Sequence, residues 1–301
     1  MGLRKKRSVH PSGVLVVDKP VGPTSHDIVA QARRIYETRT VGHAGTLDPL
    51  ASGVLLLLLG EATKLSPHLT RDNKRYRATV TFGRSTDTLD REGTEVSTSE
   101  LCPGWLQKDQ LEAALAVEAE RRQQVPPAFS AIKIQGRRAH RISRHGETVE
   151  LLPREVVVHD LSLFSFDDRS CSVDLTVSKG YYVRSFARDL AASLGVPGHL
   201  GALRRLASGC FTIEEANPWP PAERVPPIEL AAAAMRSLAV GRLSEEGTHR
   251  AHRGQRLVAA DFIGAPPQDI SAWVDGEGNL VALGEPREGS SYAVVRGFRR
   301  S

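Results

Sequence analysis

The sequence predicts a fold that mixes α-helices and β-strands (α+β), and two kinds of hydrophobic pattern carry this prediction. Apolar and polar residues alternate along residues 74–82 and 173–177, as in strands with one buried face. Residues 54–59, VLLLLL, are apolar throughout and favour a strand buried on both faces, although a buried helical segment has the same pattern. Apolar residues at helical spacing over residues 25–35 and 108–123 predict amphipathic helices.

Composition and charge limit the class of protein. The chain has 301 residues and a formal net charge of +5, which favours a polyanionic partner without identifying one. Its three cysteines, Cys102, Cys171 and Cys210, are widely spaced, so we expect neither a disulfide framework nor a zinc ribbon, and a reducing compartment fits. No apolar run has the length of a signal peptide or a membrane span, and the sequence therefore predicts a cytoplasmic protein.

The N-terminal part reads as an arm, a strand and a turn. Residues 1–12 are basic and predict a disordered arm, which is either a solvated tail or a contact to phosphate. A short apolar strand is expected at residues 13–17. The segment DKPVGPTS, residues 18–25, has turn chemistry, and Thr24 or Ser25 can cap the helix that follows.

The most informative stretch is GHAGTLDPLASG, residues 42–53. Gly42 and Gly45 allow backbone turns that a side chain would forbid, and Asp48 stands directly before Pro49, which disfavours helix. A carboxylate is thereby held on a stiff loop just before a buried strand, where catalytic groups are often placed. The same residues also fit an ordinary Asp–Pro turn in which the carboxylate caps its own loop.

A second candidate site is the segment AIKIQGRRAHRISRHG, residues 131–146. It contains five Lys or Arg and no acidic residue, and we expect a basic helix here. Such a helix is either a solvated face or a surface that displaces counterions from RNA phosphates. The basic residues are Lys133, Arg137, Arg138, Arg141 and Arg144.

The segment SKGYYVRSFARDLAASLG, residues 178–195, predicts a helix that starts near Ser185 and ends at Gly195. Arg184 then lies at the N-terminus, where a cation opposes the helix dipole. Arg184 has two interpretations. It is either an exposed arginine, which lowers the stability of the helix only slightly, or the partner of a buried anion, and Asp48 is the candidate for that anion.

The C-terminal part begins with five prolines within residues 217–227, which predict a semi-rigid linker. A short Ala-rich helix is expected at residues 228–238, and WVDGEGNLVALG, residues 273–284, predicts a hairpin. His249 and His252 have HxxH spacing but lack further ligands, so no metal site is predicted.

Four motifs resemble those of the TruB family, the tRNA pseudouridine(55) synthases. GHAGTLDPLASG resembles its catalytic motif, and GVLVVDKPVGPTSHDIV, KRYRA and KGYYVR resemble three further segments. The resemblance implies a pseudouridine synthase fold with a central, mainly antiparallel mixed sheet flanked by helices. It places the catalytic domain at 13–215 with an RNA-binding thumb at about 124–152, and a small PUA-like β-barrel at 238–301. The segment 216–237 would be a Pro-rich linker and short helix.

The resemblance also implies roles for single residues. Asp48 would be the nucleophile, held by Arg184, and Tyr76 would stack on the target base and exchange protons. The alternation of residues 74–82 by itself fits equally well with Tyr76 as an ordinary residue of the hydrophobic core. Base and RNA contacts are implied for His43, Tyr182, Leu203 and the thumb residues Lys133, Arg137, Arg138, Arg141 and Arg144, and loop support for Lys19 and Pro20. Two positions depart from the family pattern, because His140 stands where tyrosine is common and Tyr181 replaces a small residue.

The implied reaction isomerises uridine 55 in the T-arm of tRNA to pseudouridine. It is redox-neutral and needs no cofactor or metal, which fits a chain without a Walker A loop or a Rossmann fingerprint. A monomer without a protein partner is expected. Whether Asp48 attacks C6 of the ring or acts at C1′ stays open. Two alternatives are a tRNA folding chaperone and a guide-dependent, dyskerin-type synthase acting on ribosomal RNA.

Overall fold

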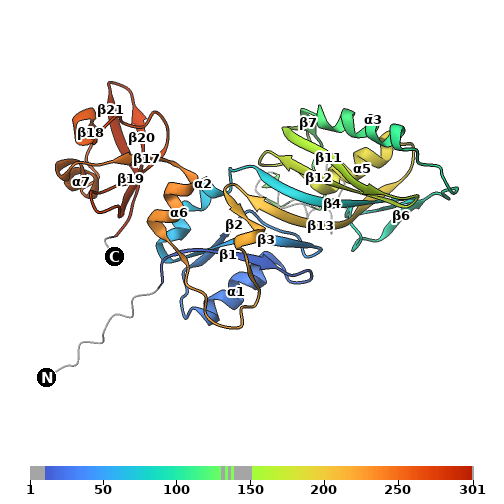
Figure 1. Ribbon diagram of the computed structural model, residues 1–301, viewed down its shortest axis with the longest axis horizontal. Coiled ribbons are helices and arrows are strands. Elements are labelled where there is room, and N and C mark those ends of the chain that lie inside the picture. Colours follow the sequence, from blue (N-terminus) through green and yellow to red (C-terminus); the bar gives the residue numbers. More distant parts are fainter. Residues whose placement is uncertain (1–10, 130–132, 135–136, 139–150, 300–301) are drawn as a thin grey trace.

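The structure is a computed structural model of the 301-residue chain, and it describes residues 11–129, 133–134, 137–138 and 151–299. One large mixed sheet lies at its centre (Figure 1). Its strands are β1 (Gly13–Lys19), β2 (Val41–Ala44), β3 (Ala51–Leu59), β4 (Lys74–Phe82), β11 (Val158–Phe166), β12 (Ser170–Val177), β13 (Gly198–Ser208), β14 (Phe211–Thr212), β15 (Asn217–Pro218) and β16 (Ile228–Glu229).

The sheet has the order β11-β12-β4-β13-β3-β1-β15, with β2, β14 and β16 added on β3, β13 and β1. Only the pairs β13–β3 and β1–β15 are parallel, and the other pairings of the described strands in this sheet are antiparallel. The mainly antiparallel mixed sheet that the resemblance implied is thereby confirmed. The strands expected at 54–59, 74–82 and 173–177 are β3, β4 and β12.

Two half-sheets meet at a narrow seam between β3 and β13. The two strands pair only over Ala51–Gly53 and Leu203–Arg205. Gly53 has φ of 101°, and a Cβ atom there would lie 2.2 Å from the carbonyl oxygen of Arg205. Glycine is therefore required for the strands to approach this closely.

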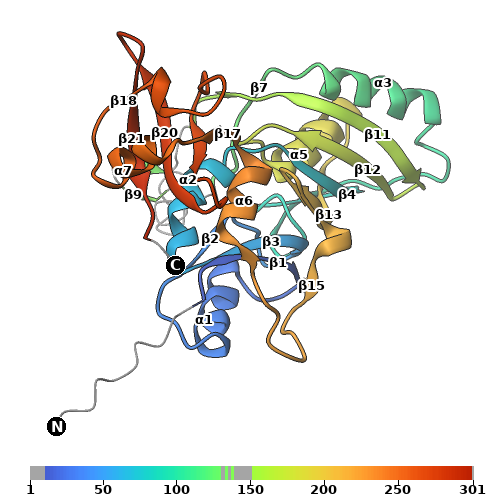
Figure 2. The same cartoon turned by 60° about the vertical axis from the view of Figure 1, so that its left-hand side comes forward.

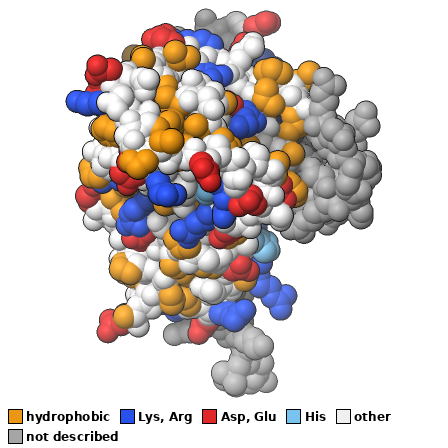
Figure 3. All heavy atoms as spheres, turned by 90° about the vertical axis from the view of Figure 1, so that its right-hand side faces the viewer, with side chains coloured by type: hydrophobic (Ala, Val, Ile, Leu, Met, Phe, Trp, Pro, Cys, Tyr) orange, Lys and Arg blue, Asp and Glu red, His pale blue; other side chains and the backbone are white. Residues whose placement is uncertain are grey.

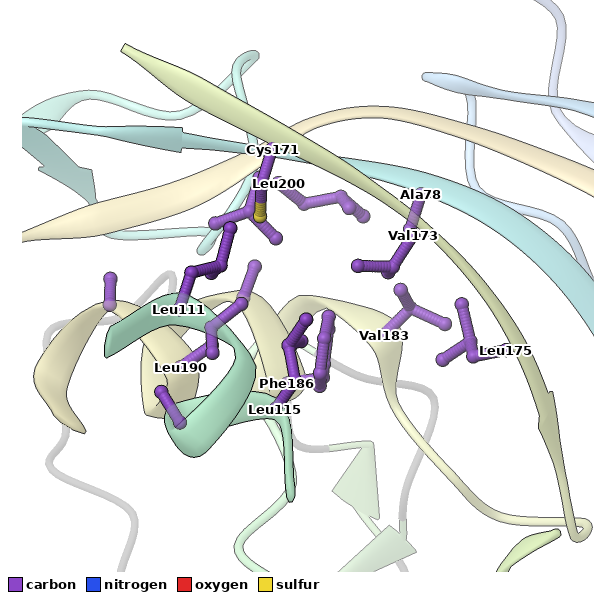
Figure 4. Close-up of a cluster of buried hydrophobic side chains, with 14 of the residues drawn as sticks. Ala78, Leu111, Leu115, Cys171, Val173, Leu175, Val183, Phe186, Leu190 and Leu200 are labelled. Carbon is purple, nitrogen blue, oxygen red and sulfur yellow. The ribbon is translucent and has the colours of Figure 1, made fainter. Parts of the chain in front are cut away.

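Helices cover one face of both half-sheets. Helix α1 (Ser25–Ile35) packs on β1 and β3, whereas α3 (Lys108–Ala119) and α5 (Val183–Ser193) pack on β4, β12 and β13. Figure 4 shows side chains of the two helices, among them Leu111, Leu115 and Phe186, facing those of the strands, among them Cys171, Val173 and Leu200. On β4 and β12 buried residues alternate with more exposed ones, so in that half of the sheet it is the helical face that is buried.

The opposite face of the β1–β3 half carries a smaller C-terminal unit. The 3₁₀ helix η1 (Gly60–Leu65), α2 (Ser66–Leu69) and α6 (Leu230–Ser237) lie between the sheet and this unit (Figure 2). Its own sheet has the order β17-β19-β20-β21-β18. The elements are β17 (Ala239–Arg242), α7 (Glu245–His252), β18 (Leu257–Val258), η3 (Ala259–Asp261), β19 (Ser271–Val274), β20 (Leu280–Arg287) and β21 (Ser291–Gly297). The hairpin expected at 273–284 is confirmed by antiparallel β19 and β20.

Short strands close the loops around the large sheet. β5 (Arg84–Thr86) pairs with β6 (Glu95–Thr98), and β7 (Gln123–Gln124) pairs with β10 (Arg154–Glu155) at the base of the segment expected to form the thumb. The 3₁₀ helix η2 (Ile213–Glu215) precedes β15. In the part of the chain that the structure describes, no helix has the length and apolar character needed to cross a membrane.

Three predictions about elements need correction. Helix α3 ends at Ala119, four residues before the expected end, and Arg121 folds back onto Glu118. The basic stretch begins as a two-stranded hairpin, β8 (Lys133–Ile134) with β9 (Arg137–Arg138), so a helix was wrong for these residues. The two strands are separated by only Gln135 and Gly136, a hairpin signal that the charge pattern obscured.

The third correction concerns the proline-rich segment. Its two ends are strands β15 and β16, which both pair with β1, and Trp219 between them is buried. The segment is therefore fastened to the large sheet rather than spanning freely between two bodies. At the N-terminus, Ser12 accepts a hydrogen bond from the Glu61 N–H at 3.2 Å, and residues 1–10 of the expected arm lie outside the described residues.

Candidate active site

Asp48 lies on the loop between β2 and β3, at the seam of the sheet. Gly45 has φ of 74°, so this position uses the left-handed region that glycine tolerates. Gly42 lies within β2 and makes no turn, contrary to the sequence prediction. The Asp48 carbonyl accepts the Ala51 N–H at 3.1 Å, which turns the chain directly into β3.

The loop is fastened to the segment that precedes α1. The hydroxyl of Ser25, which is 2% exposed, donates to the Leu47 carbonyl at 2.9 Å and accepts the Leu47 N–H at 2.8 Å. The Gly22 N–H donates to the Pro49 carbonyl at 2.9 Å. Both neighbours of Asp48 are thus fixed. The sequence offered Ser25 only as a helix cap, and the cap is Thr24, whose side chain accepts the Asp27 N–H.

Lys19 is fully buried beside this loop. Its ammonium donates to the carbonyls of Pro20 and Pro23, each at 2.8 Å, and so holds the turn before α1. Burial lowers the pKa of Lys19 to about 8, and the charge of Asp48 acts in the opposite direction. Pro20 is exposed and contributes its carbonyl to this turn.

Arg184 and Asp48 form an ion pair, which was one of the two alternatives that the sequence left open for Arg184. The Nε of Arg184 lies 3.0 Å from Oδ2 of Asp48. The arginine side chain is 9% exposed and the aspartate side chain is 40% exposed. The carboxylate therefore stays open to a substrate while its partner is shielded from solvent.

The remaining donors of Arg184 are also occupied. Nη1 donates to the Thr88 carbonyl and Nη2 to the Phe129 carbonyl, both at 2.9 Å. A second carboxylate, Asp90, lies 3.6 Å from Nη1 and is 5% exposed. Two anions thus offset the cost of a cation in the first turn of α5. Sequence reasoning missed Asp90, which lies on the loop between β5 and β6.

Tyr76 and Leu203 lie on the helical face of the sheet near the seam. Leu203 pairs with Ala78 on β4, two residues beyond Tyr76, so both side chains point to the same face. Both are partly buried and contact the two cores on either side of the seam. A notch of about 230 Å³ opens at the seam, and Asp48, Tyr76, Tyr182 and Arg184 are not among its lining residues. It is lined by Val21, Leu50, Ser52, Arg77, Thr79, Arg91, Ala202, Leu203 and Arg204.

Tyr182 and His43 complete the predicted set around Asp48. Tyr182 caps α5, and its N–H donates to Oε1 of the buried Gln124 at 2.8 Å, a partner that sequence reasoning missed. His43 lies on β2 and is half-buried, and its Nδ1 has no hydrogen-bond partner among the described residues. Burial, followed by the charge of Arg205, lowers the pKa of His43, which leaves the imidazole neutral at pH 7.

The structure places the basic stretch only in part. Lys133, Arg137 and Arg138 lie on the β8–β9 hairpin, shortly after Phe129, whose carbonyl binds Arg184. Arg141 and Arg144, like His140, lie outside the described residues. Among the residues with described positions, no group of three or more His, Cys, Asp or Glu could hold a metal ion.

Two solved structures share the fold of this chain. A solved H/ACA ribonucleoprotein bound to a substrate RNA contains a chain that superposes with a TM-score of 0.71 at 22% identity, covering 96% of this chain and 85% of that one. A Cbf5-Nop10-Gar1 complex gives a TM-score of 0.71 at 23% identity, covering 95% and 84%.

Sequence comparison gives the family. The model for the N-terminal domain of TruB family pseudouridylate synthases matches residues 33–183. A tRNA pseudouridine synthase B of Thermobifida fusca is 44% identical, covering 94% of this chain and 97% of the relative. That of Rhodopseudomonas palustris is 40% identical, covering 95% and 80%. The chain belongs to the TruB family.

Proposed function

We propose that this protein is a tRNA pseudouridine synthase that converts uridine 55 of the T-arm to pseudouridine, with Asp48 as the catalytic carboxylate. One observation carries the assignment of the site: an accessible carboxylate is held 3.0 Å from a buried guanidinium at the seam of the sheet. The relatives named tRNA pseudouridine synthase B support tRNA as the substrate. The alternatives of a chaperone and a guide-dependent synthase have no specific observation in their favour.

The reaction moves a bond and a proton without redox chemistry. The bond between N1 and C1′ breaks, the uracil turns, and a bond forms between C5 and C1′. C5 loses its proton and N1 gains one, so no cofactor is required. Asp48 acts either at C6 or at C1′, and in both cases as the ionised carboxylate. Arg184 keeps the carboxylate oriented, because its other nitrogens are bound to backbone carbonyls.

Tyr76 is the proposed base for the proton at C5. Its ring lies on the same face of the sheet as Leu203, so a uracil beside Asp48 would meet the phenol on one side and the leucine on another. Stacking on an aromatic ring is a common way of holding an extruded base. Tyr182, at the start of α5, would help to enclose this uracil.

The target base must leave its stack before it can reach Asp48. Extrusion costs a few kcal/mol, which contacts with RNA phosphates and stacking must offset. We assign the phosphate contacts to the thumb residues Lys133, Arg137, Arg138, Arg141 and Arg144. On the face drawn in Figure 3, basic and acidic side chains are interspersed, so the net positive charge is not gathered there. His43, as a neutral imidazole, would stack in the place that the base leaves.

The remaining assignments follow from the same proposal. Residues 13–215 form the catalytic domain, with the thumb at about 124–152, and residues 238–301 form a PUA-like barrel that contacts RNA. The protein acts as a monomer, in the cytoplasm and without a protein partner.

The test is release of tritium from C5-labelled uridine in an unmodified tRNA transcript, with purified protein and no guide RNA. We expect release by the wild type and none by Asp48→Ala or Asp48→Asn, with tRNA binding largely kept. Asp174→Asn is the matched control, because Asp174 is also held by an arginine, Arg77, through two contacts of 2.8 Å. Normal turnover by Asp48→Asn would refute the role of Asp48, and an inactive wild type would refute the function.

A further inference from the structure

A buried arginine, Arg205, lies beneath the loop between β2 and β3 that carries Asp48, and the proposed mechanism gives it no role. Arg205 follows Leu203 by two positions on β13 and is 1% exposed. Among the described residues it forms no ion pair with a carboxylate. Burying an unpaired charge is costly, so its hydrogen bonds must provide a large compensation.

Those hydrogen bonds go to the two sides of Asp48. Nη2 donates to the Gly45 carbonyl at 2.8 Å, and Nε donates to the Val54 carbonyl at 2.6 Å. Gly45 precedes Asp48 by three positions, and Val54 follows it by six. One guanidinium thus links both ends of the segment that carries the carboxylate. Hydrogen bonds from a charged donor in a buried position are among the stronger ones in proteins.

The anchor itself is rigid. The backbone of Arg205 pairs with Gly53 on β3 and with Tyr76 on β4, so it is fixed from both sides. A Cβ atom on Gly45 would lie 3.3 Å from Nη1 of Arg205, which shows how closely the guanidinium lies under the loop. The aliphatic chain of Lys74, also buried, lies 3.6 Å from the same point.

We propose that Arg205 is a positioning residue for catalysis, which fixes Gly45 and Val54 so that Asp48 keeps its 3.0 Å contact with Arg184 while RNA binds. It does not touch the reacting atoms and acts through the backbone of the loop. The proposal rests on the proposed role of Asp48. The pairing of β2 with β3 ends at Ala44 and Leu56, so beyond it this link helps to hold the loop. A displacement of about 1 Å at a reacting group can cost about 100-fold in rate.

An arginine outside the site supplies the control. Arg236 lies on α6, where its Nη2 lies 2.7 Å from Oε1 of Glu215 and donates to the Cys210 carbonyl at 3.1 Å, and its side chain is 36% exposed. It has the same charge and also bonds a backbone carbonyl, but these partners lie outside the loop that carries Asp48. A general effect of losing a hydrogen-bonded arginine would appear in both variants.

The experiment measures single-turnover formation of pseudouridine and the Kd for tRNA in Arg205→Met, Arg205→Lys and Arg236→Met. For Arg205→Met we expect a rate about 100-fold lower with Kd within threefold of the wild type. The rate of Arg205→Lys should be about tenfold higher than that of Arg205→Met, because an ammonium keeps the charge but lacks the planar, forked geometry of the guanidinium. Arg236→Met should stay within threefold of the wild-type rate. Thermal unfolding of each variant sets a temperature at which all are folded.

Three results would overturn the proposal: a folded Arg205→Met with a rate within threefold of the wild type, an equal loss in Arg236→Met, or a loss confined to Kd. If Arg205→Met does not fold, a folded Arg205→Lys with the rate of the wild type refutes it equally. Failure of the proposed function looks different, because it would appear as activity in Asp48→Asn or as an inactive wild type.

Discussion

All three nitrogen atoms of the Arg184 guanidinium are engaged, with Nε on Asp48, Nη1 on the Thr88 carbonyl and Nη2 on the Phe129 carbonyl. This distribution separates two tasks within one side chain. The carbonyls fix the plane of the guanidinium, and Nε is left to orient the carboxylate. A lysine would supply the charge but not the plane.

We therefore expect Arg184→Lys to lower the single-turnover rate by about 10²- to 10³-fold, with tRNA affinity much less affected. The matched control is Arg188→Lys, one turn further along α5, where the arginine contacts Asp189 and the Val125 carbonyl instead. Equal losses of rate in the two variants would show that the substitutions act by disturbing α5 and not through the contact with Asp48.

Lys19 predicts a dependence of stability on pH. Burial lowers its pKa from the ordinary 10.5 to about 8, while the unfolded chain keeps the ordinary value. Between pH 8 and 10.5 the unfolded state binds more protons than the folded state, so the contribution of Lys19 to stability rises with pH in this window. Below pH 8 the amine is charged in both states and the penalty is fully present.

The check is urea unfolding of the wild type and Lys19→Met from pH 7 to 10. The difference in unfolding free energy should stay constant to about pH 8 and then grow in favour of the wild type. Lys108→Met on α3, whose side chain is 64% exposed, removes no buried charge and serves as the control. A difference that shrinks above pH 8 would contradict the assignment.

At the scale of elements, α1 shows how one helix start can serve both folding and the site. Thr24 caps the helix through its capping box, and the next residue, Ser25, points away to hold Leu47. Thr24→Ala should cost about 1 kcal/mol of stability and leave the rate unchanged. Ser25→Ala should cost about as much or more and also lower the single-turnover rate, because the loop is released.

Measuring both variants by urea unfolding and by tritium release separates the two tasks. If Ser25→Ala retained the rate of the wild type, Leu47 would need another support.

The β8–β9 hairpin leads to a prediction about salt. Neutralising Arg137, Arg138 and Arg141 with glutamine should flatten the plot of log Kd for tRNA against log salt concentration, by about 0.7–0.9 for each phosphate contact removed. The rate at saturating enzyme should change less than the affinity. An unchanged slope would show that these thumb residues do not bind RNA phosphates.

Local patterns gave much of this architecture. The buried run of β3, the alternation in β4 and the C-terminal Gly195 of α5, with φ of 76°, all follow from residues close in sequence. The positions of Asp90 and Arg205 could not be found in this way. Arg205 and Gly45 are 160 positions apart, and only the folded sheet brings them together. The same holds for Gln124 and Tyr182, 58 positions apart.

At the scale of the molecule, the C-terminal unit is packed onto the catalytic part rather than tethered to it. One hydrophobic cluster contains Leu65 and Ala233 from the side of the large sheet and Val274, Leu283 and Phe298 from the C-terminal unit. Both ribbon views show α6 between the two (Figures 1 and 2). The two parts should therefore unfold together.

Tryptophan fluorescence tests this expectation, because Trp273 is buried in the C-terminal unit and Trp219 in the core under α1. With the other tryptophans changed to phenylalanine, the two reporters should give coincident urea transitions. Leu283→Ala should lower the midpoint of both by the same amount, at a cost of about 2–5 kcal/mol. Separate transitions would show two independent bodies.

The close contact at Gly53 has a consequence for how this enzyme can vary. A single added methyl group would wedge β3 away from β13, although both strands could keep all their other neighbours. Asp48 comes from one side of that joint, and Tyr76 and Leu203 come from the other. The spacing between the proposed catalytic acid and the surface proposed to receive the uracil thus depends on the lack of a side chain at residue 53.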